Sequence, residues 1–300
     1  MAVDVSRLKP YRQAVSDNAR WADFEPRPND IFVCTPAKCG TTWTQTIVVN
    51  LLWPDGKFPA TVMELSPWIE AQFNPLEQMH ERLRAQSHRR VIKTHTPADG
   101  IPFFTDAKYI FVARDGRDAF MSMCNHMDRM KRELVGALNA KATDDGVQPM
   151  PSWNGDVHGF FQGWIESRQH IAHVGTFWDR RAEQNQLLVH FNDLKKDLGG
   201  EMRRIARFLD VDVPASLWPG AIDRCTFESM RDHEEQVGKF DGFEGGIKGF
   251  IFKGTNGRWR DVLTKDELAL YDRRVSETLS SEAAAWMEHG RARLSGASHP

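Results

Sequence analysis

The chain has 300 residues, of which 41% are hydrophobic and 27% are charged, and its formal net charge is −2. This length can bury a sizeable core. The balanced charge argues against a general nucleic-acid binder, so any anion site must come from a local cluster of cations. No apolar run approaches the roughly 18 residues of a membrane span, and the N-terminal segment lacks the apolar core of a secretory signal. We expect a cytoplasmic protein without a membrane span.

The four cysteines have neither CxxC spacing nor histidine partners at the intervals typical of zinc sites. We interpret them as reduced thiols and expect no metal site.

The first predicted strand, residues 31–35, leads into the sequence CTPAKCGTTW and then into a predicted helix. A loop between a strand and a helix presents free backbone N–H groups, and the helix dipole makes them a site for anions. Gly40 lets the backbone approach an anion, Thr41 and Thr42 add hydroxyl donors, and Lys38 adds a charge. The order differs from the ATPase phosphate loop, in which the lysine follows the last glycine. An anion site and an ordinary strand–helix turn both remain open.

The second predicted strand, residues 91–94, ends in the sequence Lys93-Thr94-His95. A helix is expected to precede it, within residues 67–86 and beginning after Ser66-Pro67. The unperturbed pKa of histidine is about 6.5, and a nearby cation tends to keep the ring neutral, so His95 can serve as a general base. The alternative is a polar strand end with a solvated histidine.

The third predicted strand, residues 108–113, is followed by Arg114 and by a predicted helix that carries Ser122. An arginine fork and a serine hydroxyl can hold a second phosphate. The alternative is a surface ion pair of Arg114 with Asp115 or Asp118.

The rest of the chain contains a fourth strand, several helices and two loops. We expect helices over residues 42–53, 117–128, 156–173, 193–209 and 264–288. Asp193 is the predicted cap of the fourth helix, and Thr264 and Glu267 form a predicted capping box at the start of the fifth. The strand is expected over residues 186–191, and the loops are expected over residues 139–155 and 238–257. The second loop contains seven glycines. Such a segment is mobile or tightly turned, and it is either a lid over a ligand or a plain surface loop.

Strands that alternate with helices predict an α/β three-layer domain, with a central parallel sheet flanked by helices and a P-loop-like anion loop. We expect one domain over residues 1–300, with residues 1–28 as an N-terminal extension. Ligands of open parallel sheets bind outside the carboxyl ends of the strands. All three polar clusters fall at such ends, so they are expected to form one site.

Five motifs in this order resemble the cytosolic-type sulfotransferases, which use 3′-phosphoadenosine 5′-phosphosulfate (PAPS). The family's PKSGTTW loop corresponds to AKCGTTW at residues 37–43, and its KSH or KTH strand end corresponds to residues 93–95. Its arginine and the serine eight residues later correspond to Arg114 and Ser122. Its TSFxxM segment corresponds to CTFESM at residues 225–230, and its RKGxxGDW signature corresponds to FKGTNGRW at residues 252–259. The resemblance extends from about residue 29 to residue 264.

The resemblance implies transfer of a sulfuryl group from PAPS to an acceptor hydroxyl, or less often an amine, with PAP as the product. His95 would remove the acceptor proton, and Lys38 would stabilise the leaving phosphate. Lys93 and the N–H groups of Gly40 to Thr42 would hold the sulfuryl and 5′-phosphate oxygens. No metal is implied.

The same resemblance implies a set of nucleotide-binding residues. These are Lys38, Cys39, Gly40, Thr41, Thr42, Trp43, Arg114, Ser122, Phe227, Lys253 and Gly254. Trp43 would stack near the adenine with Phe227 on the other side, although Trp43 could also be a simple core residue.

The chain departs from the family pattern at several positions. Cys39 replaces a serine, which still permits a backbone cradle. Phe191 replaces a frequent tyrosine and removes a hydroxyl near the base. Phe252 replaces the signature arginine, so a cation is lost or supplied by Lys253 or Arg258. The family's dimer motif is degraded at residues 260–269, which leaves the oligomeric state open.

The acceptor pocket is expected to take walls from residues 68–80, 120–130 and 139–155, which are rich in Phe, Met and Trp. They favour a small apolar or phenolic acceptor. Two rival functions are a nucleotide-dependent, kinase-like phosphotransferase and a non-catalytic PAP-binding protein of the same fold. The first would need Mg²⁺ and lacks a convincing GK[ST] motif, and the retained Lys38, Lys93 and His95 argue against the second.

Overall fold

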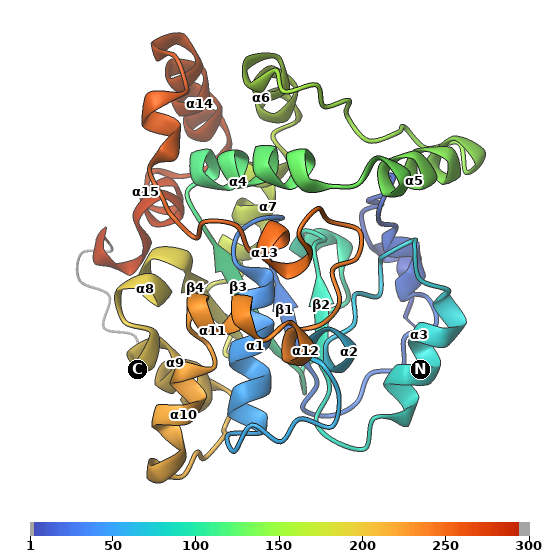
Figure 1. Ribbon diagram of the computed structural model, residues 1–300, viewed down its shortest axis with the longest axis vertical. Coiled ribbons are helices and arrows are strands. Elements are labelled where there is room, and N and C mark those ends of the chain that lie inside the picture. The colour runs from blue at the N-terminus through green and yellow to red at the C-terminus, as the bar shows by residue number, and fades with distance from the viewer. Residues whose placement is uncertain (1–2, 294–300) are drawn as a thin grey trace.

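A parallel sheet of four strands forms the centre of the computed structural model, which describes residues 3–293 (Figure 1). The strands are β1 Ile31–Cys34, β2 Val91–Thr94, β3 Lys108–Ala113 and β4 Gln186–His190, in the order β2-β1-β3-β4. All four predicted strands are confirmed. Strands β1 and β4 are each one residue shorter than predicted. Strand β4 ends at His190 because Phe191 already begins the next helix.

Fifteen α-helices surround this sheet within the described residues. They are α1 Thr41–Leu52, α2 Val62–Leu65, α3 Leu76–Ala85, α4 Gly116–Arg129, α5 Arg132–Asp144, α6 Val157–Ser167, α7 Gln169–Trp178, α8 Phe191–Lys196, α9 Leu198–Phe208, α10 Trp218–Asp223, α11 Phe227–Asp232, α12 Glu234–Val237, α13 Gly246–Phe250, α14 Lys265–Thr278 and α15 Ser281–His289. Short 3₁₀ helices cover Val5–Arg7, Asn18–Trp21, Ala98–Gly100, Ala215–Leu217, Arg258–Asp261 and Gly290–Arg293.

Both faces of the sheet are buried, which explains why its strands are apolar without clean alternation. On β1, Ile31 and Val33 join a core cluster with residues of α1 and α9. Phe32 and Cys34 point to the opposite face and join a cluster with residues of α7, α14 and α15. The predicted three-layer α/β arrangement is therefore confirmed.

Three long predicted helices are interrupted in the structure. Residues 156–173 form α6 and α7, which meet at Arg168 in a left-handed conformation with φ of 53°. Residues 193–209 are divided by Asp197, which caps α9 by accepting from the Gly200 N–H, whereas the predicted cap Asp193 lies inside α8. The third, 264–288, is divided between α14 and α15, and its predicted capping box is confirmed.

Two other predictions were only partly right. The helix expected within residues 67–86 begins at Leu76, because Pro75 precedes it and cannot continue a helix toward the N-terminus. The loop expected over residues 139–155 is wrong in its first part, since α5 continues to Asp144.

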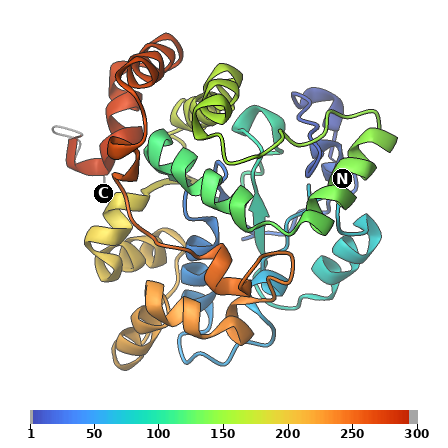
Figure 2. The ribbon, with the colours of Figure 1, turned by 45° about the horizontal axis from the view of Figure 1, so that its top comes forward.

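The parallel register brings all four strands to an end at one edge. Cys34 pairs with Thr94 on β2 and with Phe111 on β3, and Ala113 pairs with His190. The residues that follow the strands, Thr35, His95, Arg114 and Phe191, therefore lie at this edge. Short helix α13 lies over it and packs against α4 (Figures 1 and 2).

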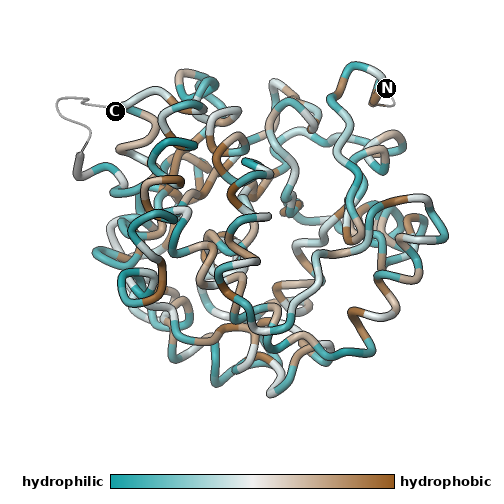
Figure 3. Tube along the Cα trace, turned by 90° about the horizontal axis from the view of Figure 1, so that it is seen from above, coloured by the Kyte–Doolittle hydropathy of each residue, from teal (hydrophilic) through white to brown (hydrophobic). Residues whose placement is uncertain are grey.

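None of the helices between residues 3 and 293 has both the length and the apolar character that crossing a membrane requires. Figure 3 shows hydrophilic residues along the outer helices.

Candidate active site

A cavity of about 970 Å³ opens at the carboxyl edge of the sheet. All the site residues predicted from the sequence line it, except Cys39, which is buried. The predicted residues along its wall are Lys38, Gly40, Thr41, Thr42, Trp43, Lys93, His95, Arg114, Ser122, Phe227, Lys253 and Gly254. The expectation that the separate polar clusters form one site is borne out by this convergence, while the role of each residue stays a prediction.

The loop between β1 and α1 requires glycine at position 40 for two reasons. Gly40 has a φ of 100°, in the region that favours glycine, and an added Cβ would lie 3.0 Å from the Phe191 ring. No side chain caps the N-terminus of α1. Its first N–H groups therefore face the cavity edge as donors for an anion.

His95 is held as a neutral base. Its Nδ1 lies 2.8 Å from the carbonyl oxygen of Thr35, which can only accept, so Nδ1 carries the proton and Nε2 keeps its lone pair. Burial, together with the charges of Lys93 and Lys38, lowers the pKa of His95 to about 3. The ring is half-buried in the cavity wall and fixed by a backbone partner, which favours a general base over the solvated histidine that the sequence left open.

Neither Lys38 nor Lys93 forms an ion pair in the part of the chain that the structure describes, although the carboxyl group of Glu70 partly offsets the effect of burial on the pKa of Lys93. Lys38 Nζ lies 3.2 Å from His126 Nδ1 and 4.7 Å from the centre of the Phe250 ring. Lys93 Nζ lies 4.5 Å from the centre of the Trp68 ring. Burial, and for Lys38 also the neighbouring Lys93 and Arg114, lowers the pKa to about 7 for Lys38 and about 8 for Lys93. An anionic group would supply the missing negative charge.

Arg114 is only 4% exposed and is held by the end of the glycine-rich segment. Its guanidinium donates to the side chain of Asn256 at 2.7 Å and to the carbonyl of Thr255 at 3.0 Å, and it lies 4.2 Å from the centre of the Phe191 ring. The surface ion pair with Asp115 or Asp118 that the sequence left open is wrong, because Arg114 is buried, Asp115 pairs with Arg117, and Asp118 accepts from the Gly257 N–H.

Two aromatic side chains line the region where the sequence places the adenine. Trp43 donates its indole N–H to the carbonyl of Cys225 at 2.8 Å and packs edge-on against Phe191 at 5.3 Å. Gly254 allows the chain to pass close to Phe227, because a Cβ there would lie 2.8 Å from that ring. Trp43 thus contacts the protein interior and also faces the cavity.

Phe252, which replaces the signature arginine of the family, has a specific environment. The guanidinium of Arg129 and the ammonium of Lys253 each lie 5.2 Å from the centre of its ring. Lys253 and Arg258, the substitutes considered for the lost cation, both line the cavity. Arg258 Nε is buried without a hydrogen-bond partner among the described residues.

The far end of the cavity is apolar. Each predicted wall contributes to it: Trp68 and Phe73 come from residues 68–80, Met123, Met127 and Met130 from residues 120–130, and Met150 from residues 139–155. His126 also comes from the predicted wall 120–130, but its chemistry was not recognised. Sequence reasoning missed Leu134 and Leu138 of α5, and Phe240, Phe243 and Phe250 of the glycine-rich segment. The phenylalanines interspersed among its glycines were an available signal that this segment forms part of the acceptor wall.

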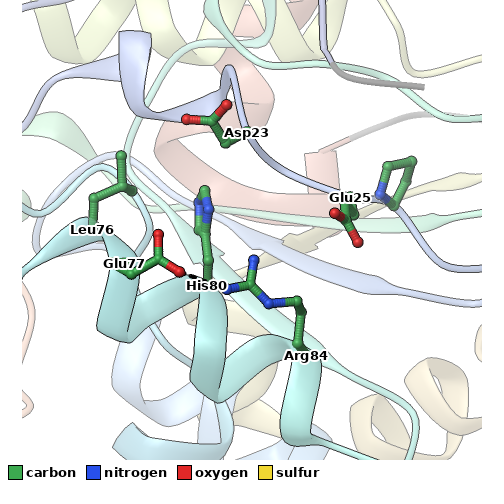
Figure 4. Close-up of a pocket in the computed structure, with 7 residues that line it drawn as sticks. Asp23, Glu25, Leu76, Glu77, His80 and Arg84 are labelled. Carbon is green, nitrogen blue, oxygen red and sulfur yellow. Dashed lines mark hydrogen bonds and ion pairs between the residues drawn. The ribbon is translucent and has the colours of Figure 1, made fainter.

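A second cavity, of about 860 Å³, shares no lining residue with the first. Figure 4 shows the carboxylates of Asp23, Glu25 and Glu77 there, with His80 and Arg84 of α3. None of the motifs contributes to it, but Leu76, Glu77 and His80, which were expected in the acceptor wall as part of residues 68–80, line this second cavity instead. Across residues 3–293, no three His, Cys, Asp or Glu side chains are grouped so that they could hold a metal ion.

The fold and the larger cavity define a three-layer α/β protein with an electropositive site at the end of its sheet. A family model for the sulfotransferase domain matches residues 28–282. A glycolipid sulfotransferase of Mycobacterium tuberculosis is 30% identical over 94% of both chains. Human sulfotransferase 1C2 is 26% identical over 90% of this chain and 89% of the relative.

Solved structures show the same fold at lower identity. A crystal structure of mouse sulfotransferase SULT7A1 complexed with PAP has a TM-score of 0.67, with 19% identity over 88% of both chains. Retinol dehydratase in complex with androsterone and PAP has a TM-score of 0.62, with 20% identity over 86% of this chain and 82% of that one. The chain belongs to the sulfotransferase family, and the prediction of a sulfotransferase enzyme is confirmed.

Proposed function

We propose that this enzyme transfers a sulfuryl group from PAPS to a hydroxyl, or less often an amine, of a small apolar or phenolic acceptor. The observation that carries the proposal is the pair of Lys38 and Lys93, two cations that line the cavity without carboxylate partners. They lie in the same cavity as the uncapped N-terminus of α1. A phosphosulfate supplies the charge and the acceptor oxygens that these groups lack.

Each catalytic group has a distinct task in this proposal. His95 Nε2 accepts the proton of the acceptor hydroxyl, whose oxygen then forms a bond to sulfur. The bond between sulfur and the bridging phosphate oxygen breaks, and Lys38 donates a hydrogen bond to that oxygen. Lys93 and the N–H groups of residues 40–42 hold the remaining oxygens, so positioning and electrostatics supply most of the rate.

The nucleotide would lie between Trp43 and Phe227, with Ser122, Arg114 and Lys253 toward its 3′-phosphate. Arg114 already donates to Asn256 and Thr255. It also donates to the carbonyl of Lys38, which leaves one N–H of Nη1 for a phosphate. The side chain of Asn256 is itself held, because its amide donates to Asn192 at 2.5 Å. Arg258 is a second candidate for the cation that Phe252 removes.

The direct test is a screen of acceptors with PAPS that measures the formation of PAP. The panel should contain phenols, sterols, long-chain alcohols and glycolipids, since a relative with 30% identity is named a glycolipid sulfotransferase. We expect acceptor-dependent PAP formation that His95→Ala abolishes. Absence of PAP formation with every acceptor class, together with no binding of PAP, would overturn the proposal.

A further inference from the structure

His126 is a polar residue in the apolar half of the cavity. It lies on α4, and its ring centre is 4.8 Å from that of Phe243 and 5.7 Å from that of Phe250. Its neighbours along the same wall, Met123 and Met127, are apolar. No motif in the sequence marks His126 as a site residue, and the mechanism above does not use it.

The contact with Lys38 fixes which nitrogen of His126 carries the proton. Lys38 Nζ lies 3.2 Å from His126 Nδ1, and an ammonium group can only donate. Nδ1 must therefore accept, which places the proton on Nε2 of the neutral ring. Burial and the charges of Lys38 and Lys93 lower the pKa of His126 well below its usual value, so the ring stays neutral.

His126 Nε2 has no hydrogen-bond partner in the described part of the chain, and it is not among the atoms sealed from the cavity. It is an unused donor. His95 has the opposite arrangement, because its Nδ1–H is held by Thr35 and its Nε2 can only accept. The cavity thus presents one accepting and one donating imidazole nitrogen.

We propose that His126 is a specificity residue, whose Nε2–H recognises a second oxygen of the acceptor while His95 receives the attacking hydroxyl. This rests on the proposed function, and it narrows the acceptor class to apolar molecules that carry two oxygens near one end, such as alkyl diols, catechols or glycosides. An acceptor with a single hydroxyl leaves the Nε2–H unpaired. The loss of a hydrogen bond of this kind lowers affinity by about tenfold.

The experiment compares three probes that share one apolar chain: octan-1-ol, octane-1,2-diol and octyl glucoside. Their affinities for the enzyme saturated with PAP are measured by calorimetry, and their turnover with PAPS is measured separately. We expect the better of the two oxygen-rich probes to bind at least about tenfold more tightly than octan-1-ol. In His126→Phe this ratio should fall to about one.

Two further variants separate recognition from other effects. His126→Gln carries an amide donor near the position of Nε2 and should restore much of the ratio. Met123→Leu changes the same wall without touching a polar group, so its ratio should match that of the wild type. His126→Phe also loses the contact with Lys38, but this loss changes the affinities of all three probes by the same factor. The ratio of their affinities therefore does not depend on that contact.

Equal affinity for all three probes in the wild type would overturn the inference, and so would a preference that persists in His126→Phe. The proposed function fails in a different way. If octane-1,2-diol or octyl glucoside binds preferentially through His126 but PAPS is never turned over, the recognition stands and the sulfuryl transfer does not.

Discussion

His95 receives its orientation and its charge state from different neighbours. The carbonyl of Thr35 fixes the tautomer, whereas burial and the nearby lysines lower the pKa to about 3. Such a ring is a weak base in the free protein. A bound anionic nucleotide would offset the charges of Lys38 and Lys93 and raise the pKa of His95, so its basicity depends on the co-substrate.

Replacement of His95 by alanine tests the base directly. Loss of a general base typically costs 10²–10⁴-fold in rate, so His95→Ala should lose turnover by about this factor. Affinity for PAP should stay within a few fold of the wild type, because the ring does not hold the nucleotide. Turnover is measured as PAP formation and affinity by calorimetry, and near-normal turnover would remove His95 from the mechanism.

Replacement of Lys38 by methionine should lower turnover but raise the stability of the folded protein. The loss of a donor to the leaving group should slow turnover by roughly two or three orders of magnitude. The folded-state pKa of Lys38 is about 7, below the ordinary value of 10.5, so the unfolded chain binds more protons between these values. The buried charge of Lys38 therefore lowers the free energy of unfolding. This effect is fully present below pH 7 and disappears as the pH rises above 10.5.

Without nucleotide at pH 6.5, Lys38→Met should therefore have a higher Tm than the wild type, by roughly a few degrees. Lys265→Met removes an exposed lysine and is the matched control, for which we expect little change. A Tm for Lys38→Met equal to that of the control would mean that burial of this cation costs nothing. Unchanged turnover with weaker PAPS binding would make Lys38 a plain binding residue.

At the scale of elements, residues 238–257 connect both halves of the cavity. Their backbone pairs with the α4–α5 corner, where the Glu244 N–H donates to Arg129 at 2.8 Å and Gly242 accepts from Lys131 at 2.9 Å. Further along, Lys195 donates to the carbonyl of Gly254 at 2.7 Å. These contacts attach the segment at several points, and the glycines between them allow the backbone to change conformation, as a lid requires.

We expect hydrogen exchange in residues 238–257 to slow when PAP is added, because the nucleotide would add contacts to Lys253 and Gly254. Helix α14 contributes no residue to the cavity, so its exchange should stay the same. Equal protection of residues 238–257 with and without PAP would show that they form an ordinary loop.

The sequence was sufficient to predict the sheet, because strands buried on both faces are short apolar runs whose limits are visible. It was not sufficient to predict the helix breaks. Arg168 adopts a left-handed conformation without being glycine, and Asp197 caps a new helix in the middle of an apolar pattern. Helix α5 was not predicted at all, and its residues past 138 were expected as loop because few apolar side chains mark its end.

The candidate site likewise contains residues that could be predicted from the sequence and residues that could not. The residues near the strand ends could be predicted because their chemistry is local to a strand–loop–helix motif. The role of His126 could not be predicted, because it depends on the contact with Lys38, which is 88 residues away in the sequence. The attachment of Arg114 to Asn256 likewise joins positions 142 residues apart. Such pairings are decided by the packing of the whole chain.

At the scale of the whole molecule, the cavity should discriminate between nucleotides. PAP carries a 3′-phosphate and ADP does not, so only PAP can use Arg114 and Ser122 together. A hydrogen bond to a charged group contributes about 1.5–3 kcal/mol, and two such contacts, reduced because Phe252 removes a cation, should give at least roughly tenfold preference for PAP. Arg114→Ala should erase most of this preference by weakening PAP alone.

Calorimetric titration of both nucleotides into the wild type and the variant provides the measurement. Arg129→Ala is a suitable control, since Arg129 contacts Phe252 but does not line the cavity. Equal affinities for PAP and ADP in the wild type would return the kinase-like alternative to first place.

Because residues 238–257 contribute Phe243 and Phe250 to the acceptor wall and Lys253 and Gly254 to the nucleotide region, one segment forms part of both subsites. Ordering that element for one ligand changes the entropy that the other must lose on binding. Linkage then demands reciprocity: if PAP changes the affinity for the acceptor by some factor, the acceptor changes the affinity for PAP by the same factor. A tightly held product would in this way retain an acceptor in a dead-end complex, so substrate inhibition at high acceptor concentration follows from the shared segment.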